Sequence, residues 1–519
     1  MRERARFGRV FRSVFSYGSP TTPIECGMKD ALFFLPSCRI KSKRQNGMLF
    51  NSLIFAMFLP AVFAGYWLMQ KNFKAQNLWL LVASYVFYGW WDWCYLFLIA
   101  ACSTVNFWAG RLIYDSNSKM LRRGLLSLCC LVCLGALGIF KYFNFFTDSF
   151  AQLFSLIGVH WSPIVLNIAL PVGISFFTFQ ALSYTIDVAL GNLKPTKSWV
   201  EFFVFISFFP QLVAGPIERA TNLLPQFQHE RRFDFDAATH GVCLMAYGLF
   251  KKMVVADTLS QYVDKVWIDP MFYSSVTCVI GSVFFALQIY CDFSGYSDVA
   301  RGVARLFGFE LMLNFDRPYL AKSFSEFWRR WHISLSSWFK DYVYIPLGGN
   351  RVAFPKLIRN LWIVFLLSGL WHGASWTFVL WGAIHALYLT LGVVSARIFG
   401  KRILNGFFSK IMSIAVVDIG VVFAWIWFRA GTFEKASCFF KAMFRCKFET
   451  SLMALCAGIG PMQFGFCIVA ALLLGISYLC PRDCKFATLY GKFFFSIACI
   501  AAIVFIGMTS GGEFIYFRF

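Results

Sequence analysis

The sequence has too few charged residues for a protein that dissolves in water. Asp, Glu, Lys and Arg make up 14% of its 519 residues, against about 25% in an ordinary soluble protein. Hydrophobic residues make up 59%, so the chain lacks the polar surface that would cover a folded core in water. This composition excludes a soluble fold and indicates a membrane protein.

Several common catalytic and structural motifs are also missing. The sequence contains no GxSxG elbow, HExxH pair, Walker loop or GxGxxG motif. It shows no internal repeat, which gives no support to an inverted-repeat transporter. Its 17 cysteines are scattered, and the pair Cys480 and Cys484 lacks a second cysteine or histidine cluster to complete a zinc site. We therefore expect free thiols, no bound metal and no bound cofactor.

Long apolar segments dominate the chain instead. A helix needs about 20 mostly apolar residues to cross a bilayer, and many segments approach this length. We predict an all-α, polytopic membrane protein with about ten to twelve crossings, together with re-entrant and interfacial helices. The candidate segments are Leu53–Leu68, Leu78–Cys102, Leu125–Phe140, Ile164–Ile186, Phe202–Ala214, Val276–Tyr290, Leu361–Ala396, Ile414–Phe428, Phe464–Leu479 and Phe493–Met508.

The formal net charge of +22 comes from 48 Lys and Arg against 26 Asp and Glu. The basic residues lie between apolar segments, as at Arg122–Arg123, Lys251–Lys252 and Arg397–Arg402. Anionic lipid and the basic bias of cytoplasmic loops explain them more simply than nucleic acid. Orientation stays open, because Asp92 leaves undecided whether residues 78–110 cross once or twice.

Residues 1–47 differ from the rest of the chain. They are basic, irregular and broken by prolines, and they lack the apolar core of a signal peptide. Met48 begins MLFNSLIFAMFLPAVF, which is typical of a first spanning helix. We interpret residues 1–47 as an extension, either a disordered arm or, as we favour, a stretch upstream of the true start at Met48. Residues 48–519 would then form one transmembrane domain.

His372 lies in a stretch without Asp, Glu, Lys or Arg from Leu361 to Ala396. At the helical rise it lies about 16 Å from the polar edge at Asn360, near the middle of a hydrocarbon layer of about 30 Å. An ionisable group there is costly, and its default interpretation is a functional residue facing a cavity. Burial favours the neutral imidazole, which can take a proton from a hydroxyl that attacks an acyl group. The alternative is a structural histidine, hydrogen-bonded within the core.

A second histidine lies in the most polar part of the chain, Asp292–Arg359. There Ser323-Phe-Ser-Glu326 has the capping-box spacing, and aromatic residues follow it on one helical face. His332 falls at the border of this face, so we expect it to point inward from an interfacial helix. Together with His372 it predicts a single polar pocket, although a merely anchoring role for His332 stays open.

Five other charged residues are candidates for contact with substrate. Arg329, Arg330 and Lys340 lie on the opposite face of the same predicted helix and point to water or headgroups. Asp292 ends a predicted crossing, where it either lines the pocket or is simply solvated. Arg219 follows a glutamate where a predicted crossing leaves the membrane. The two residues either form an ion pair or contact a charged substrate, and the sequence does not favour one of these over the other.

Several segments resemble a known family. They are YCDFSGYSDVARGVARLFGF, NFDRPYLAKSFSEFWRRWHISLSSWFKDYVYIPLGGNR, FFPQLVAGPIERATNLLPQF, GLWHGASWTFVLWG and the closing FIYFRF. Together they are similar to the membrane-bound O-acyltransferase (MBOAT) family. Within it, they resemble the branch of the membrane subunit of bacterial alginate O-acetyltransferase. The resemblance runs from Met48 to Phe519.

The resemblance implies an acyltransferase whose helices surround a funnel through the bacterial inner membrane. It implies that His372, in the WHG motif, is catalytic and that His332, in WRRWHIS, helps shape the site. It also implies acetyl-CoA as the donor. Our own hypothesis adds that Arg and Lys of the Arg317–Arg351 block hold the phosphates of this donor. The expected partners are a periplasmic SGNH-like acetyltransferase and a polysaccharide synthase complex.

The acceptor implied by the resemblance is alginate or a similar exopolysaccharide. Peptidoglycan, another glycan, or D-alanyl transfer to teichoic acid stay open as alternatives. Two other classes also stay open, namely an exporter of acyl groups or glycan without catalysis and a scaffold for a synthase complex.

Overall fold

The computed structural model describes residues 47–213, 215–400, 406–449, 451–508 and 514–515. The chain divides into two compact units, Met1–Gln45 and Asn46–Phe519, and the described residues all belong to the second. The interpretation of residues 1–47 as an extension therefore lies almost wholly outside the described residues. Like the choice of Met48 as the start, it stays a prediction.

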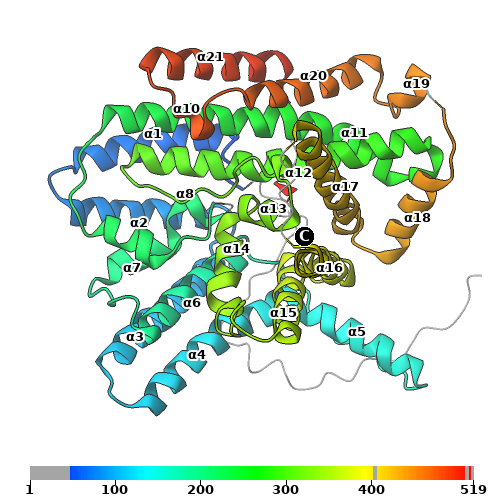
Figure 1. The fold of residues 1–519 in the computed structure, drawn as a ribbon. Coiled ribbons are helices and arrows are strands. Elements are labelled where there is room, and N and C mark those ends of the chain that lie inside the picture. Colours follow the sequence, from blue (N-terminus) through cyan, green and yellow to red (C-terminus); the bar gives the residue numbers. More distant parts are fainter. Residues whose placement is uncertain (1–46, 214, 401–405, 450, 509–513, 516–519) are drawn as a thin grey trace, which may run out of the picture. The chain divides into compact units, whose positions relative to one another are not determined.

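Every regular element within the described ranges is a helix (Figure 1). The α-helices are α1 (Leu53–Leu68), α2 (Phe73–Gly89), α3 (Tyr95–Asp115), α4 (Lys119–Leu137), α5 (Phe143–Leu156), α6 (Ile174–Leu190), α7 (Trp199–Ser207), α8 (Phe209–Leu212), α9 (Ala220–Leu223), α10 (Phe235–Leu249), α11 (Asp257–Ile268), α12 (Ser275–Leu306), α13 (Phe324–Arg330), α14 (Ile333–Phe339), α15 (Phe354–His372), α16 (Trp376–Phe399), α17 (Phe407–Ala430), α18 (Phe433–Phe444), α19 (Leu452–Leu455), α20 (Pro461–Ser477) and α21 (Leu489–Ile506). Three π-helical turns, η2 (Gly138–Tyr142), η4 (Phe250–Ala256) and η7 (Lys340–Tyr344), interrupt or follow them, and 3-10 turns lie at Leu224–Phe227, Pro270–Phe272, Pro318–Leu320 and Arg482–Cys484.

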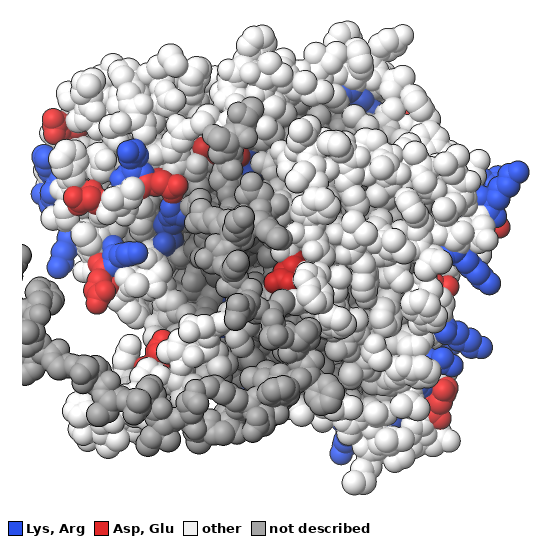
Figure 2. Space-filling view, turned by 180° about the vertical axis from the view of Figure 1, so that it is seen from behind, with Lys and Arg blue, Asp and Glu red and all other residues white. Residues whose placement is uncertain are grey.

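Many of these helices are suited to a lipid environment. Six helical stretches in the described residues are long and apolar enough to cross a membrane: Tyr95–Asp115, Lys119–Leu156, Ser275–Leu306, Trp376–Phe399, Phe407–Ala430 and Leu489–Ile506. Shorter apolar helices lie at Leu53–Leu68, Ile174–Leu190, Trp199–Leu212 and Pro461–Ser477. On the face shown in Figure 2, Lys and Arg side chains gather on two opposite sides, and the described surface between them is mainly uncharged. The prediction of an all-α, multi-pass membrane protein is confirmed.

Three predicted crossings are interrupted. The segment Leu78–Cys102 is broken near Asp92, whose carboxylate accepts the N–H of Cys94 at 2.9 Å between two separate helices, α2 and α3. The segment Ile164–Ile186 was predicted to be helical throughout, but its helix begins only at Ile174. Proline and glycine account for the second difference, because residues 157–173 contain both types and Gly173 has a φ of 75°.

The segment Phe202–Ala214 is the third predicted crossing that is interrupted. It is divided between the short helices α7 and α8, which meet at Phe208 just before Pro210. A proline removes a backbone donor and clashes with the preceding helical turn, so one continuous helix cannot form there.

The stretch Leu361–Ala396 bends, as its length predicts. It forms α15 and α16, joined by a short link after His372. The two helices touch through glycine: a Cβ at Gly369 would lie 2.3 Å from the carbonyl oxygen of Phe378, and one at Gly382 would lie 2.2 Å from that of Phe365. Only glycine permits this approach, which places the end of α15 against the start of α16.

The centre of the protein is α12, which runs beside α10 (Figure 1). Most of its residues are buried, including Phe293 and Tyr296 near its middle. Because the long helix passes through the core, the ring of Phe293 reaches that of His332.

Candidate active site

His372 is the last residue of α15 and is buried. Gly373 follows in an extended conformation, and a Cβ there would lie 2.2 Å from the ring of Phe378. The imidazole lies among aromatic rings, with centroids 5.0 Å from Trp381 and 5.4 Å from Phe428. His372 is thus held in an apolar, aromatic surrounding inside the protein, while its predicted depth in the bilayer stays a prediction.

The end of α15 is capped by the turn η2. A helix leaves its last four carbonyls without intrahelical donors, and here three of them are bonded from outside. The hydroxyl of Tyr142 donates to the carbonyl oxygen of Leu370 at 3.0 Å. The ammonium of Lys141 donates to those of Trp371 at 2.7 Å and His372 at 3.2 Å. These bonds fix the backbone that carries the histidine.

His332 does not lie within a helix, contrary to prediction. The capping box at Ser323 forms as expected, with the Ser323 hydroxyl accepting the N–H of Glu326 at 3.1 Å. However, α13 ends at Arg330, and His332 adopts a left-handed conformation, with φ 44° and ψ 55°, before α14 begins. It is also fully buried within the protein.

The break at His332 is held by the segment around Asn314. The N–H of Ile333 donates to the Asn314 carbonyl oxygen at 2.9 Å. The side-chain oxygen of Asn314 accepts from the Ser334 hydroxyl at 2.9 Å and lies 3.1 Å from Nδ1 of His332. An oxygen that accepts makes Nδ1 the protonated nitrogen of His332. Its Nε2 is then an acceptor, and it has no hydrogen-bond partner among the described residues.

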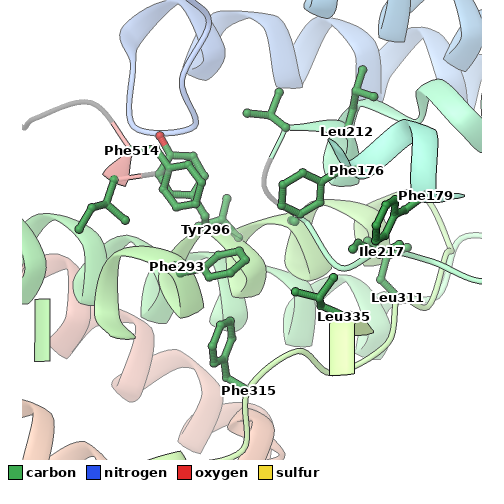
Figure 3. Packing of buried hydrophobic residues seen from close by; sticks show 14 of the residues in the cluster. Phe176, Phe179, Leu212, Ile217, Phe293, Tyr296, Leu311, Phe315, Leu335 and Phe514 are labelled. Atoms are coloured by element: carbon green, nitrogen blue, oxygen red, sulfur yellow. The ribbon is translucent and has the colours of Figure 1, made fainter. Parts of the chain in front are cut away.

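The two histidines lie next to each other in the core. Their ring centroids are 6.4 Å apart, and the ring of Trp371 lies 5.9 Å from that of His332. Figure 3 shows Phe293 among the buried apolar residues, and its ring centroid lies 4.7 Å from that of His332, edge to face. The structure therefore brings together the two residues predicted to form one pocket, while their chemical roles stay predictions.

Two cavities reach the neighbourhood of the pair. The larger, of about 1350 Å³, lies between α13–α14 and α15–α17, and it is lined by Ile333 next to His332 and by Ser368 one turn before His372. The smaller, of about 90 Å³, is lined by Lys141, Trp371 and His372 itself. It has room for about three water molecules or one small acyl group.

The predicted binding residues divide between the large cavity and ion pairs. Arg329 and Lys340 line the large cavity together with Lys322. Arg330 does not line it, because its guanidinium pairs with the carboxylate of Glu326 at 2.6 Å.

Arg219 and Glu218 do not pair with each other. Arg219 pairs with the carboxylate of Asp341 at 3.1 Å. Glu218 is buried and accepts hydrogen bonds from the Asn222 amide at 2.8 Å and the Met312 N–H at 2.5 Å. Burial raises the pKa of Glu218 to about 7.

Asp292 lies inside α12 and not at the end of a crossing. Its carboxylate pairs with Lys252 at 2.6 Å, and Lys252 also pairs with Asp257 at 2.8 Å. The second carboxylate oxygen of Asp292 accepts the N–H of Ile515 at 2.6 Å, which ties the backbone at Ile515 to α12. Lys251, predicted with Lys252 as a loop residue, is buried in η4 and pairs with Asp298. Burial of both lysines is possible because acids on α11 and α12 neutralise them.

Sequence reasoning missed Lys141 and Asp418. Each is the single charged residue of a long apolar stretch. For Lys141 the stretch runs from Arg123 to Asp148, and for Asp418 it runs from Lys410 to Arg429. The criterion that selected His372, an ionisable group deep in an apolar segment, would have selected both.

Comparisons with known proteins agree with this geometry. Residues 192–429 match the model of the membrane-bound O-acyltransferase family. The chain is 38% identical to a probable alginate O-acetylase of Pseudomonas aeruginosa over 82% of this chain and 81% of that protein. It is 35% identical to a peptidoglycan O-acetyltransferase of Helicobacter pylori, over 76% of this chain and 80% of that protein. A teichoic acid D-alanyltransferase of Bacillus subtilis is 27% identical over 42% of this chain and 58% of its own length. The protein, an acyltransferase embedded in lipid, belongs to the membrane-bound O-acyltransferase family.

Proposed function

We propose that this acyltransferase takes acetyl groups from acetyl-CoA and passes them across the bacterial inner membrane for the acetylation of an exported polysaccharide. The observation that carries this proposal is the buried pair of His332 and His372, which is approached by a large cavity with cationic walls and by a small cavity at His372. The large cavity is lined by Ile333 and Ser368, close in sequence to the two histidines, and the small cavity is lined by His372, so we place the donor in the first and the acceptor in the second.

The large cavity suits the donor. Its volume of about 1350 Å³ exceeds the roughly 300–1,000 Å³ of ordinary small-molecule sites, as a long thioester requires. Lys322, Arg329 and Lys340 supply positive charge for phosphates, and the remaining wall is largely apolar. Coenzyme A combines these features, with phosphates at one end and an uncharged pantetheine arm ending in the thioester.

The transfer requires one base. His372 accepts the proton of the acceptor hydroxyl while the hydroxyl oxygen attacks the acetyl carbonyl carbon. The carbon–sulfur bond then breaks, and the proton passes from His372 to the leaving thiolate. His332, whose ring lies 6.4 Å from that of His372, helps to shape the site beside it. Aromatic rings around His372 keep water away, which protects the thioester from hydrolysis.

The acceptor of the proposed pathway is alginate or a similar exopolysaccharide, reached through a periplasmic SGNH-like partner beside a polysaccharide synthase complex. The Pseudomonas relative, described as an alginate O-acetylase, supports this choice. The Helicobacter relative keeps peptidoglycan as the second candidate.

The test is the acetyl content of secreted polysaccharide in strains that carry single variants at normal protein levels. His372→Ala should abolish acetylation, whereas His229→Ala, at an exposed position, should leave it unchanged. Unchanged acetylation in the His372 variant would overturn the mechanism. Acetylated peptidoglycan with unmodified polysaccharide would reassign the acceptor. Export of acetyl groups without consumption of acetyl-CoA by purified protein and its partner would point to an exporter instead.

A further inference from the structure

Asp418 places a carboxyl group in the middle of a membrane-spanning helix. It lies halfway along α17, which has 24 residues, so it is about 17 Å from either helix end. Its Oδ1 is buried, and the carboxyl group makes no hydrogen bond or ion pair with any residue that the structure describes. A charged group at this depth is costly and is kept where it has a partner. No part of the proposed mechanism uses it.

Asp418 lines a groove that opens from the side of the protein. The groove has a volume of about 490 Å³ and lies between α12 and α17, with α18 at one end. On α17 its wall follows Asp418, Val422 and Ile426, and on α12 it follows Ser282 and Ala286. Both sets repeat every four residues, so two parallel ridges border the groove along the helix axes. The small side chains of Ser282 and Ala286 would let a third helix approach closely.

The other polar groups of the groove are already satisfied within the chain. The hydroxyl of Tyr319 donates to the Ala286 carbonyl oxygen at 2.7 Å and accepts the indole N–H of Trp425 at 3.2 Å. The hydroxyl of Ser282 donates to the Val279 carbonyl oxygen at 2.8 Å. A donor for Asp418 must therefore come from a molecule that enters the groove.

We propose that this groove binds a transmembrane helix of a partner protein that carries a Lys or Arg at mid-membrane depth. Charge complementarity selects this occupant, since a cation would neutralise Asp418 and donate to its Oδ1. A lipid headgroup does not reach the bilayer centre. A second copy of this chain would bring another Asp418 to the contact and would supply no cation there.

The experiment uses the full chain in phosphatidylcholine vesicles and two synthetic peptides of about 21 residues, enough to span the bilayer. The peptides consist of Leu and Ala and differ only at the central position, Lys in one and Leu in the other. Energy transfer between labelled protein and labelled peptide measures binding. The Lys peptide should bind the native protein about tenfold more tightly than the Leu peptide. The Asp418→Leu variant should lose this preference.

Controls separate the groove from other causes. Asp148→Leu removes an exposed acid on α5 and should keep the preference for the Lys peptide. Ser282→Phe fills the groove and should weaken binding of both peptides. Asp418→Asn, nearly isosteric, should lose most of the preference even if Asp418→Leu fails to fold. Equal binding of the two peptides to the native protein, or a preference that survives in both Asp418 variants, would overturn the proposal. Energy transfer between two labelled copies of the protein that is lost in the Asp418 variants would show that the groove binds a second copy. That result would also overturn the proposal.

Discussion

Lys141 donates a hydrogen bond to the backbone of His372, at 3.2 Å between Nζ and the carbonyl oxygen. The two residues are far apart in the sequence, and a second bond from Nζ to the Trp371 carbonyl oxygen, at 2.7 Å, strengthens the link. The orientation of the proposed catalytic imidazole thus depends on a cation in another helical segment.

We expect Lys141→Met to lower the rate of acyl transfer by about 100-fold, because a displacement of about 1 Å at the reacting group costs this much. Lys141→Arg keeps a cationic donor and should recover part of the rate. The measurement is the turnover of acetyl-CoA by purified protein with its acceptor, reported as separate kcat and KM. The loss should fall on kcat, since Lys141 does not line the large cavity. A Met variant with native kcat would contradict this role.

Asn314 should control the tautomer of His332. Replacing Asn314 by Leu removes the oxygen that lies 3.1 Å from Nδ1 of His332, and either ring nitrogen can then carry the proton. We expect acyl transfer to fall by about tenfold to 100-fold, in line with the loss of groups that orient a functional histidine. Asn117→Leu, at an exposed position, is the matched control. The nitrogen chemical shifts of the His332 ring report the tautomer, and unchanged shifts in the Asn314 variant would refute the assignment.

The buried ion pairs of Lys252 should matter for stability more than for catalysis. Lys252→Met leaves the carboxylates of Asp257 and Asp292 without their cation, which typically costs about 3–5 kcal/mol. Thermal unfolding in detergent should show a clear decrease in Tm. The double variant Lys252→Met with Asp292→Asn should regain part of it, since one uncompensated charge is removed. Lys435→Met, on the exposed side of α18, should leave Tm unchanged.

Glu218 predicts a pH-dependent stability. Its pKa rises from 4.5 to about 7 on burial, so the folded protein holds a proton that the unfolded chain has released between these values. This contribution is fully present below about pH 4.5 and is lost as the pH rises through about 7. The contribution of Glu218 to the free energy of unfolding is at most about 3 kcal/mol, because each unit of difference in pKa between the folded and unfolded states corresponds to about 1.4 kcal/mol.

Glu218→Gln should remove this dependence, because the amide mimics the protonated acid. Unfolding in detergent from pH 5 to pH 8 measures it, and the native protein should lose more stability over this range than the variant. Parallel curves for the two proteins would show that Glu218 does not bind the proton.

The sequence predicted the features that depend on local patterns. The bounds expected for the first helix, Leu53–Leu68, are those of α1, and the chain bends after His372 as its length requires. His332 and His372 lie next to each other, as the predicted single pocket requires, although that pocket itself stays a prediction. These features can be predicted from the hydrophobicity of a segment and from the spacing of its apolar residues. A segment in lipid must form all its backbone hydrogen bonds internally, so an apolar segment of sufficient length forms a helix.

The features that the sequence did not predict depend on contacts between distant segments. The helical period runs through His332 without interruption, but the N–H of Ile333 and the carbonyl of Arg330 bond to residues 314 and 316 and break the helix there. Lys252 is buried only because Asp257 and Asp292 accompany it. No local pattern in the sequence shows such pairings.

The cap on α15 has a consequence for biosynthesis. Lys141 and Tyr142 leave the ribosome long before the carbonyl groups that they bind, since α15 follows much later in the chain. Until α15 enters the membrane, the ammonium of Lys141 must be solvated by water or headgroups at the edge of its segment. We therefore expect Lys141 to reach its final position only after α15 has entered the membrane.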